Sequence, residues 1–552
     1  MSPMSYIKSW FPPILFPQRA LPTKLTADGH LTDVLMADTA EQAMAEAAKI
    51  NFPDDFMLGA ATAAYQVEGG LHACNWAAWE RSGRNGEHFA GKACDHWTLF
   101  EADVKRMKAL GLRMYRFSVD WSRCEPQEGT FDEAALHRYA SWCKLLRANG
   151  IEPMVTLHHF VEPEWFDALG GWEKAENVRY FRRFADAVCA KLCPHCTYWC
   201  TLNELNGFAM CGWVAGIHPP GKKDDVFGMI VVIKNMLVAH TQACRAIRQA
   251  SAGCVQVAGA RNTPQAGAGG APKPIICLAN SHILFTPTGG YGPMALFSAI
   301  TAVLVSYLFN YLYADMLILG RVAWPVQLLV WILGWGQDLK DLKGTVDCLG
   351  LNHYYRSVVR YEKVSKTSGR TPGAGDLFIH LPFGVALSAM GIAGFEKSEM
   401  GWCAPLTLSL AAREQPPVYR RTPRTPLDPV VSVLACVLRA SRRDLTPSSW
   451  EALIRSMHQR YACPMIVTES GIADGGAPDV QRTRYLAATL GVAERMRAEG
   501  VDLRGWLIWT LMDNFEWAEG FRPRFGLLST NFKTLARGER ASNAILKKIL
   551  VK

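Results

Sequence analysis

Short apolar runs alternate with longer amphipathic stretches along most of this chain. Eight of the short runs have the length and composition of β-strands, and polar or aromatic residues follow them. They cover residues 56–65, 114–121, 152–160, 198–205, 255–260, 346–355, 465–471 and 505–515. Between them, stretches such as 174–192 repeat apolar residues at three- and four-residue steps, which is typical of helices that pack one face on a core.

Strands that alternate with helices form right-handed βαβ units and a parallel sheet. Eight such units predict an α/β fold, a single (β/α)8 TIM barrel with long loop insertions. In this fold, functional residues collect at the carboxyl ends of the strands. The unusual polar residues of the sequence follow the predicted strands in this way: Gln66, Arg116, His159, Asn203, Glu204, Asn352, Glu469 and Glu516.

Three stretches depart from the alternation. Residues 1–50 precede the first strand and are expected to be an N-terminal extension, either flexible or targeting. Residues 51–552 are expected to form the barrel domain, with insertions near 261–300 and 404–445. The second insertion is rich in Pro and Arg, a composition that fits a flexible loop and equally an error in the translated gene, such as a retained intron.

One apolar segment raises the question of a membrane. Residues 274–314 contain no Asp, Glu, Lys or Arg, and their length would permit one crossing. A crossing between two barrel strands would place the two halves of the barrel on opposite sides of the membrane. A buried or surface-lying barrel helix is therefore the preferred interpretation, and peripheral association with a membrane stays open.

Composition and charge narrow the function classes. Hydrophobic residues make up 49% of the 552 residues, enough for a large core. The formal charge of +9 comes without any basic block, so nucleic acid is excluded as a partner. The chain has 18 Trp and 16 Tyr, whose rings stack on sugars or fill a core.

Sixteen cysteines are scattered without a disulfide framework, and the opening apolar stretch is short and broken by prolines. Free thiols and a cytoplasmic location are expected. An organelle or a membrane surface is the alternative, because no acidic residue precedes Asp28 and a transit peptide is allowed. Cys193, Cys196 and Cys200 surround His195, but a lone CxxC is weak evidence for zinc. A helix-to-strand connection with buried thiols is preferred, and no metal or other cofactor is expected.

Two glutamates have the topology that glycoside hydrolysis requires. Hydrolysis with retention needs two carboxyl groups about 5–5.5 Å apart, one ionised and one protonated. The runs TLNEL at 201–205 and VTESG at 467–471 each place a glutamate directly after a predicted strand. A barrel can bring two such distant residues together at one rim.

Three further sequence blocks accompany the two blocks that contain these glutamates. FPDDFMLGAATAAYQVEGG opens the first strand region, GLNHYY occupies 350–355, and WTLMDNFEWAEGFRPRFGL occupies 509–527. With TLNEL and VTESG, they resemble the blocks of glycoside hydrolase family 1, the β-glucosidase family, in the same order. The resemblance extends from about Phe52 to the C-terminus.

The resemblance implies a retaining β-glycosidase that removes a terminal β-linked sugar through a covalent glycosyl-enzyme. Glu469 would be the nucleophile and Glu204 the acid/base, while Arg116 would keep Glu469 ionised and Tyr354 would orient it. The glycoside would be the partner of a set of polar and aromatic residues, with Trp402 on the aglycone side. The implied set around the sugar is Gln66, His159, Asn203, Asn352, Trp509, Glu516 and Trp517.

Both glutamates are retained, although the sequence departs from the family pattern at several neighbouring positions. Leu205 and Ser470 replace the residues that usually follow them, and Phe160 and Val161 stand where many members have Trp-Asp.

Two alternative functions stay open. One is a membrane-associated transglycosylase acting on glycolipid, suggested by VDWSR at 119–123, the paired histidines at 158–159 and the apolar segment. The other is an inactive carbohydrate-binding relative, which the retention of both carboxylates disfavours. The sequence fixes neither the sugar, nor the aglycone, nor the oligomeric state.

Overall fold

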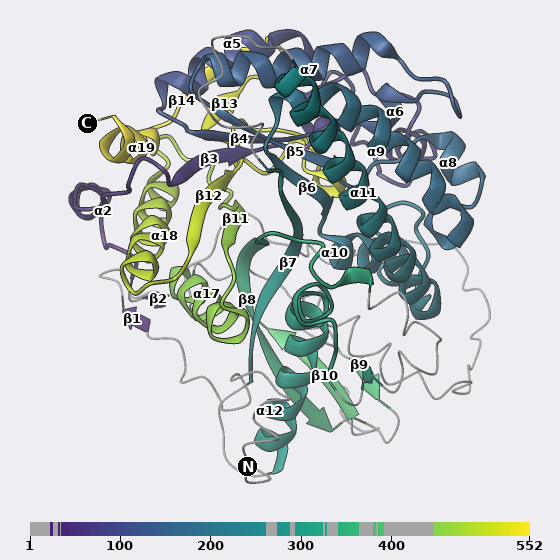
Figure 1. Cartoon of the computed structure of the whole chain (residues 1–552). Helices are drawn as coiled ribbons and strands as arrows, with labels where there is room; N and C mark the ends of the chain where they lie inside the picture. Colours follow the sequence, from purple (N-terminus) through teal and green to yellow (C-terminus); the bar gives the residue numbers. More distant parts are fainter. Residues whose placement is uncertain are drawn as a thin grey trace.

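The structure, a computed structural model, describes residues 35–260, 273–287, 293–323, 341–363 and 446–551 and a few short segments. Eight parallel strands close into a barrel, because the last strand pair, β11 with β8, joins the two ends of the sheet (Figure 1). The predicted TIM barrel is confirmed. In barrel order the strands are β3 (Met57–Ala61), β4 (Met114–Ser118), β5 (Glu152–His158), β6 (Tyr198–Asn203), β7 (Ile275–Pro287), β8 (Leu349–Lys363), β11 (Met465–Ser470) and β12 (Leu503–Trp509).

Helices surround this barrel and connect its strands (Figure 1). The longer ones are α5 (His96–Ala109), α7 (Glu133–Ala148), α9 (Val178–Leu192), α11 (Val226–Ala260), α12 (Pro293–Ser306), α17 (Pro447–Tyr461) and α18 (Val480–Ala498). Short elements follow several strand ends, among them α3 (Ala64–Val67), α4 (Asn75–Arg81), α6 (Trp121–Cys124), α8 (Glu164–Ala168) and α10 (Leu205–Ala209). Outside the barrel lie the small antiparallel pairs β1 (Thr23–Leu25) with β2 (Leu31–Asp33), and β13 (Leu528–Thr530) with β14 (Arg537–Glu539). The strands β9 (Ile379–Leu381) and β10 (Val385–Met390) extend the sheet from β8.

The fifth barrel strand differs from the prediction. Residues 255–260 were expected to form it, but they are the last residues of α11. The strand is β7, which begins at Ile275 and lies inside the region expected to be an insertion near 261–300. The prediction was wrong because a short apolar run does not by itself distinguish the end of a helix from a strand. In β7, nine of the thirteen positions between Ile275 and Pro287 are buried, on both faces of the sheet, and such a strand shows no alternation.

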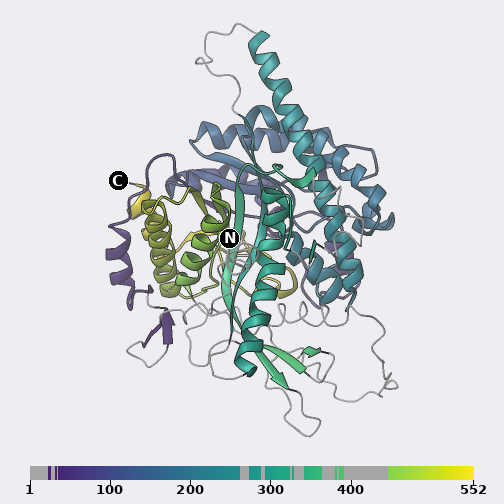
Figure 2. The ribbon, with the colours of Figure 1, turned by 60° about the horizontal axis from the view of Figure 1, so that its bottom comes forward.

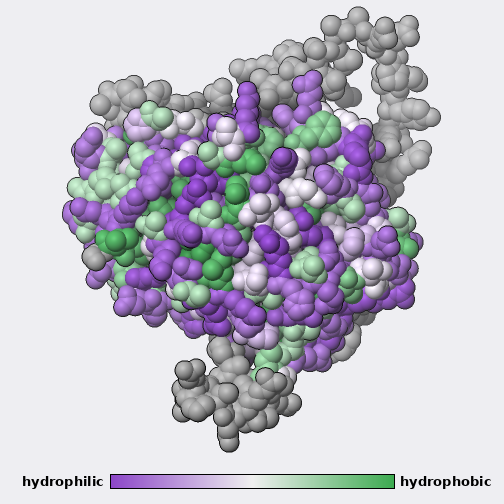
Figure 3. Space-filling model, turned by 90° about the horizontal axis from the view of Figure 1, so that it is seen from above, coloured by the Kyte–Doolittle hydropathy of each residue, from purple (hydrophilic) through white to green (hydrophobic). Residues whose placement is uncertain are grey.

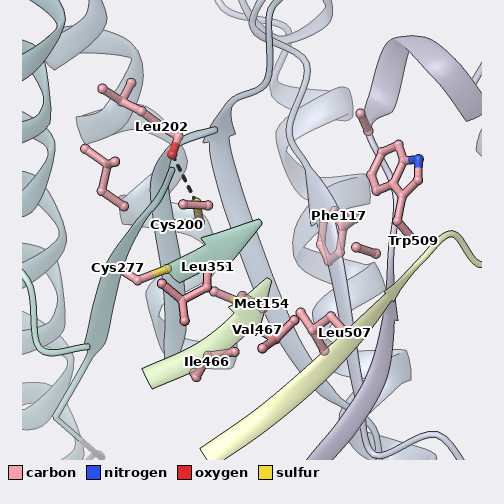
Figure 4. Close-up of a cluster of buried hydrophobic side chains, with 14 of the residues drawn as sticks. Phe117, Met154, Cys200, Leu202, Cys277, Leu351, Ile466, Val467, Leu507 and Trp509 are labelled. Carbon is pink, nitrogen blue, oxygen red and sulfur yellow. Dashed lines mark hydrogen bonds between the residues drawn. The ribbon is translucent and has the colours of Figure 1, made fainter. Parts of the chain in front are cut away.

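Side chains fill the interior of the barrel. Figure 4 shows Phe117, Met154, Cys200, Cys277, Leu351, Val467 and Leu507 meeting from successive strands, and Trp509 lies toward one end of this cluster. All of these residues are buried. The barrel is therefore a packed core that can hold the residues at its rim in fixed positions.

The outer helices are amphipathic, as their periodicity predicts. On α7, Leu136, Tyr139, Cys143 and Leu146 face the core at three- and four-residue steps. Seen from above, the outer surface is mostly hydrophilic with small apolar patches (Figure 3). At the N-terminal side, α2 (Ala40–Ala47) packs against α18, so residues 40–47 of the predicted extension contact the barrel helices.

Two helices of the described residues are long and apolar enough to cross a membrane, Val226–Cys254 and Ala302–Leu319. Buried helices of a barrel pass the same test, and 72% of the second window is buried. The segment 274–314 accordingly supplies a strand, β7, and the helix α12, which packs on β7 and β8 and confirms the predicted barrel helix. The helix α11, drawn in teal, extends beyond the body of the barrel (Figure 2). Membrane association stays a prediction.

Two other predictions concern connections. The thiols Cys193, Cys196 and Cys200 follow α9 and enter β6, which confirms the helix-to-strand connection. Within the part of the chain that the structure describes, no group of three or more His, Cys, Asp or Glu side chains could hold a metal ion. Trp402 and the stretch 404–445 lie outside the described residues.

Candidate active site

The carboxylate of Glu469 lies at the carboxyl end of β11, buried and held by two donors. Arg116 Nη1 donates to its Oε1 at 2.8 Å, and the Tyr354 hydroxyl donates to its Oε2 at 2.7 Å. Burial raises the pKa of Glu469 above its ordinary value, while Arg116, Tyr354 and Asn352 oppose this rise. The Arg116 charge thus favours the ionised carboxylate, but burial has the larger effect on the pKa of Glu469.

Several further hydrogen bonds hold the guanidinium of Arg116 in place. It comes from β4, is fully buried, and donates through Nε to Thr156 Oγ1 at 2.9 Å and through Nη1 to the Thr468 carbonyl at 3.1 Å. Its Nη2 donates to Asn203 Oδ1 at 2.7 Å. A guanidinium with this many partners is a rigid donor, so its position relative to Glu469 is set by three different strands.

Glu204 follows β6 directly and adopts the left-handed conformation with φ 42° and ψ 51°. This conformation is strained for a residue with a side chain, and such strain is found at functional sites. The Glu204 amide donates to the Ala279 carbonyl of β7 at 2.7 Å, which anchors the turn. A Cβ at Gly207 would lie 3.1 Å from Glu204 Oε2, so a glycine there leaves room for the carboxyl group.

One asparagine connects the two glutamates. Asn352 of β8 donates through Nδ2 to Glu204 Oε1 at 3.0 Å and to Asn203 Oδ1 at 3.0 Å. The same side chain is close enough to Glu469 to lower the pKa of that carboxyl. Burial and the charges of Glu469, Glu204 and Glu516 raise the pKa of Tyr354 well above its ordinary value. The carboxylates predicted from distant parts of the sequence therefore gather around Asn352 and Tyr354.

Aromatic rings form a wall next to this group. His159 stacks on Trp509 with ring centroids 5.8 Å apart and an angle of 24°, and on Trp517 at 6.3 Å and 20°. Trp509 Nε1 donates to Glu516 Oε1 at 3.2 Å, which ties the wall to a buried carboxylate. Trp517 also stacks on Tyr65 at 6.0 Å with an angle of 5°. Faces of this kind bind the apolar faces of sugar rings.

Two buried polar atoms of the predicted sugar-binding set have no hydrogen-bond partner among the described residues, Gln66 Oε1 and His159 Nδ1. Gln66 Nε2 donates to the Phe515 carbonyl at 2.7 Å, and Asn203 Nδ2 donates to His159 Nε2 at 3.0 Å, so both side chains are fixed. Burial lowers the pKa of His159 well below its ordinary value, which keeps the ring neutral. Buried polar groups without partners are costly, and a polyhydroxyl ligand would supply the missing hydrogen bonds.

The structure brings together eleven of the twelve predicted site residues, and the twelfth, Trp402, lies outside the description. Sequence reasoning missed Thr156 and Thr468, whose hydroxyls bond Arg116 Nε and Asn352 Oδ1. A threonine within the apolar runs 152–160 and 465–471 was the available signal. The departures are accommodated: Leu205 is buried at the start of α10, and Ser470 Oγ lies 3.2 Å from the Tyr485 hydroxyl.

A (β/α)8 barrel with two glutamates joined through one asparagine at its carboxyl rim has the architecture of a glycosidase. Comparisons with known proteins agree. The profile described as Glycosyl hydrolase family 1 matches residues 48–266 and 430–552. The chain belongs to glycosyl hydrolase family 1, and it is a β-glycosidase, a glycoside hydrolase acting on O-glycosyl bonds.

Individual relatives are similar over nearly their whole length. Beta-glucosidase A of Acetivibrio thermocellus is 27% identical over 526 residues, which cover 91% of this chain and 98% of that protein. Thermostable beta-glucosidase B of Thermobispora bispora is 28% identical over 550 residues, which cover 94% and 95%. Among solved structures, a beta-glycosidase from Pyrococcus horikoshii superposes with a TM-score of 0.67 at 25% identity, covering 91% of this chain and 95% of its own. A family 1 β-glucosidase from Thermotoga maritima, at 23% identity and a TM-score of 0.70, covers 91% and 99% and supports the fold.

Proposed function

We propose that this β-glycosidase is a retaining β-glucosidase that works by double displacement, with Glu469 as nucleophile and Glu204 as acid/base. The observation that carries the proposal is the setting of Glu469. Its carboxylate accepts hydrogen bonds from a cation and a phenol, Arg116 and Tyr354, and Asn352 links it to Glu204. A carboxylate next to a buried cation is suited to be the ionised member of the pair, which assigns the proton to the other member.

In the first step, Glu469 would attack the anomeric carbon, and the bond from that carbon to the leaving oxygen would break. Glu204 would give its proton to the departing oxygen, so that an alcohol leaves and a glycosyl ester remains on Glu469. The ester carries no charge, and loss of the negative charge favours the ionised form of Glu204. Ionised Glu204 would then take a proton from water as the water attacks the anomeric carbon and frees Glu469.

The sugar would lie against the wall of His159, Trp509 and Trp517. Glu516 would accept hydrogen bonds from its hydroxyls, and the buried atoms Gln66 Oε1 and His159 Nδ1, which have no partner within the described part of the chain, would bond to other hydroxyls of the sugar. Asn203, held by Arg116, would contact the hydroxyl beside the anomeric carbon. The Thermotoga maritima relative has been solved in complex with glucoimidazole, and we expect the same compound to occupy this subsite.

The stereochemistry of the product tests the mechanism. We expect β-glucose to be the first anomer formed from a β-glucoside, because two displacements at one carbon restore its configuration. Proton NMR spectra recorded within the first turnovers distinguish it from the α anomer. In parallel, a 2-deoxy-2-fluoroglucosyl fluoride should leave one covalent sugar on the peptide that contains Glu469. The α anomer as first product, or a label on another peptide, would refute the assignment.

The comparisons with known proteins support neither of the two alternative functions, glycolipid transglycosylation and an inactive carbohydrate-binding relative.

The pH profile tests the role of Arg116. Its charge opposes the rise in the pKa of Glu469 that burial causes, so removing the charge raises this pKa further. The acid limb of kcat/KM, where the nucleophile becomes protonated, should move to higher pH in Arg116→Met by about 1 unit or more. Arg116→Lys keeps the charge and should move it less. Identical acid limbs in all three proteins, each with an unchanged melting temperature, would contradict the role.

A further inference from the structure

A turn of strained backbone follows β5 and carries part of the aromatic wall. His159 begins the turn, and Phe160 next to it has φ 70°, in the left-handed region that residues with a side chain rarely occupy. The centroid of the Phe160 ring lies 5.1 Å from that of His159 and 5.4 Å from that of Trp517. Strained backbone persists only where its surroundings hold it, so the contacts around this turn matter for the wall.

Asn75, the first residue of α4, makes the contacts that hold the turn. Its Nδ2 donates to the Phe160 carbonyl at 3.2 Å and also to Glu162 Oε2. Its Oδ1 accepts from the Trp76 amide at 2.7 Å and from the Glu162 amide at 3.3 Å. An asparagine side chain has two N–H donors and one oxygen with two lone pairs, so Asn75 makes every hydrogen bond that it can. The backbone amide of Asn75 adds a bond to the Glu162 carbonyl at 2.9 Å.

Glu162 and the backbone keep the Asn75 amide in one orientation. Glu162 is buried, and its Oε1 accepts from Trp172 Nε1 at 2.6 Å and lies 3.3 Å from His158 Nε2. Turning the Asn75 amide over would place its NH2 group against the backbone N–H groups of Trp76 and Glu162. The Phe160 carbonyl therefore always faces a donor.

Asn75 also lies next to the support of the second half of the wall. The Trp76 ring packs on Trp517 with centroids 4.8 Å apart. A β-bridge between Cys74 and Pro163 holds the two loops together on either side of Asn75. Because all polar atoms of its side chain are already bonded and the residue is 4% exposed, Asn75 can act on a sugar only through its neighbours.

We propose that Asn75 is a positioning residue of the sugar site, which fixes the turn after β5 so that His159 Nδ1 meets a hydroxyl of the sugar. The inference rests on the proposed function, because it takes His159 as a contact of the sugar. Asn203 holds Nε2 of the same ring at 3.0 Å, while Nδ1 has no partner among the described residues. Asn75 thus sets the backbone of the turn, and Asn203 sets the ring. Loss of Asn75 should weaken one contact with the sugar more than the others.

Deoxy substrates test this role. We measure kcat/KM for nitrophenyl β-glucoside and for its 3-, 4- and 6-deoxy analogues. The hydroxyl that His159 binds is the one whose removal lowers kcat/KM in the wild type but not in His159→Ala. Asn75→Asp replaces the donor to Phe160 by an oxygen. In this variant we expect the cost of removing that hydroxyl to shrink by about tenfold, and the costs of removing the others to stay within about twofold of the wild type.

A second variant and a matched control complete the test. Glu162→Gln cannot accept from both Trp172 and Asn75, so it should show the same selective change to a smaller degree, and it decides the question if Asn75→Asp does not fold. The control is Asn235→Asp, at an asparagine that is 3% exposed and donates to the Trp172 carbonyl at 2.8 Å. Its hydroxyl costs should match those of the wild type.

Two results would overturn the positioning role. One is a folded Asn75→Asp protein with the hydroxyl costs of the wild type, and the other is an equal change in the cost of every hydroxyl, as a merely weakened fold would give. If no hydroxyl distinguishes His159→Ala from the wild type, the sugar contact of His159 within the proposed function fails, and the inference falls with it.

Discussion

Glu469→Gln is expected to lower kcat for nitrophenyl β-glucoside by roughly four orders of magnitude or more, as losses of catalytic nucleophiles do. The amide has the shape of the carboxylate and its oxygen can still accept from Tyr354, which donates to Glu469 at 2.7 Å in the native protein. It is not nucleophilic, however, and cannot form a glycosyl ester. Release of nitrophenol, measured with enzyme concentrations raised to match the loss, gives the rate.

Glu499→Gln is the matched control for this variant. Glu499 is another glutamate, 39% exposed and paired with Arg455 on the surface, so its replacement should leave kcat unchanged. Thermal unfolding of both variants excludes a collapsed fold as the cause. A folded Glu469→Gln protein that turns over the substrate at the wild-type rate would remove Glu469 from the mechanism.

Glu204→Gln is expected to affect different substrates unequally. For a glucoside with an alkyl alcohol as leaving group, the loss of the proton donor should lower the rate by about 10²–10⁴-fold. Nitrophenolate leaves without protonation, so the first step should persist with a nitrophenyl glucoside, and a glycosyl-enzyme should accumulate because water lacks its base. Mass spectrometry of the intact protein detects this intermediate.

Azide gives the decisive comparison. It attacks the glycosyl-enzyme without needing a base, so it should restore turnover of the nitrophenyl glucoside in Glu204→Gln and yield a β-glucosyl azide. Azide should not restore the formation of a β-glucosyl product by Glu469→Gln, since that variant forms no glycosyl-enzyme. An equal loss for both leaving groups, without rescue by azide, would contradict the acid/base role of Glu204.

Apolar periodicity predicted most of the barrel strands, and the family resemblance predicted the residues of the site. Seven of the eight predicted runs overlap barrel strands, because a strand buried between helices must be short and apolar, and its end must turn to polar residues at the rim. The resemblance to the family, and not periodicity, predicted that Arg116 and Tyr354 lie beside Glu469, and the structure places both there although 353 residues separate Arg116 from Glu469.

The fifth strand shows where pattern reasoning stops. Residues 255–260 and 275–287 are both apolar, and only one of them pairs with β6 and β8. Local sequence cannot decide between them, because the end of a helix and a strand buried on both faces can present the same short apolar run. The hydrogen-bond ladder of the closed barrel decides it: β7 supplies the partners that β6 and β8 need on their facing edges.

By itself, the sequence predicted the (β/α)8 barrel and seven of its eight strands from periodicity, and the resemblance of five sequence blocks to glycoside hydrolase family 1 singled out Glu204 and Glu469. The tertiary structure alone decided that Asn352 joins Glu204 to the residues around Glu469 and that burial outweighs Arg116 in the pKa of Glu469. These features depend on distances between side chains of different strands and on the exclusion of water, and neither quantity is encoded in any one segment of the chain.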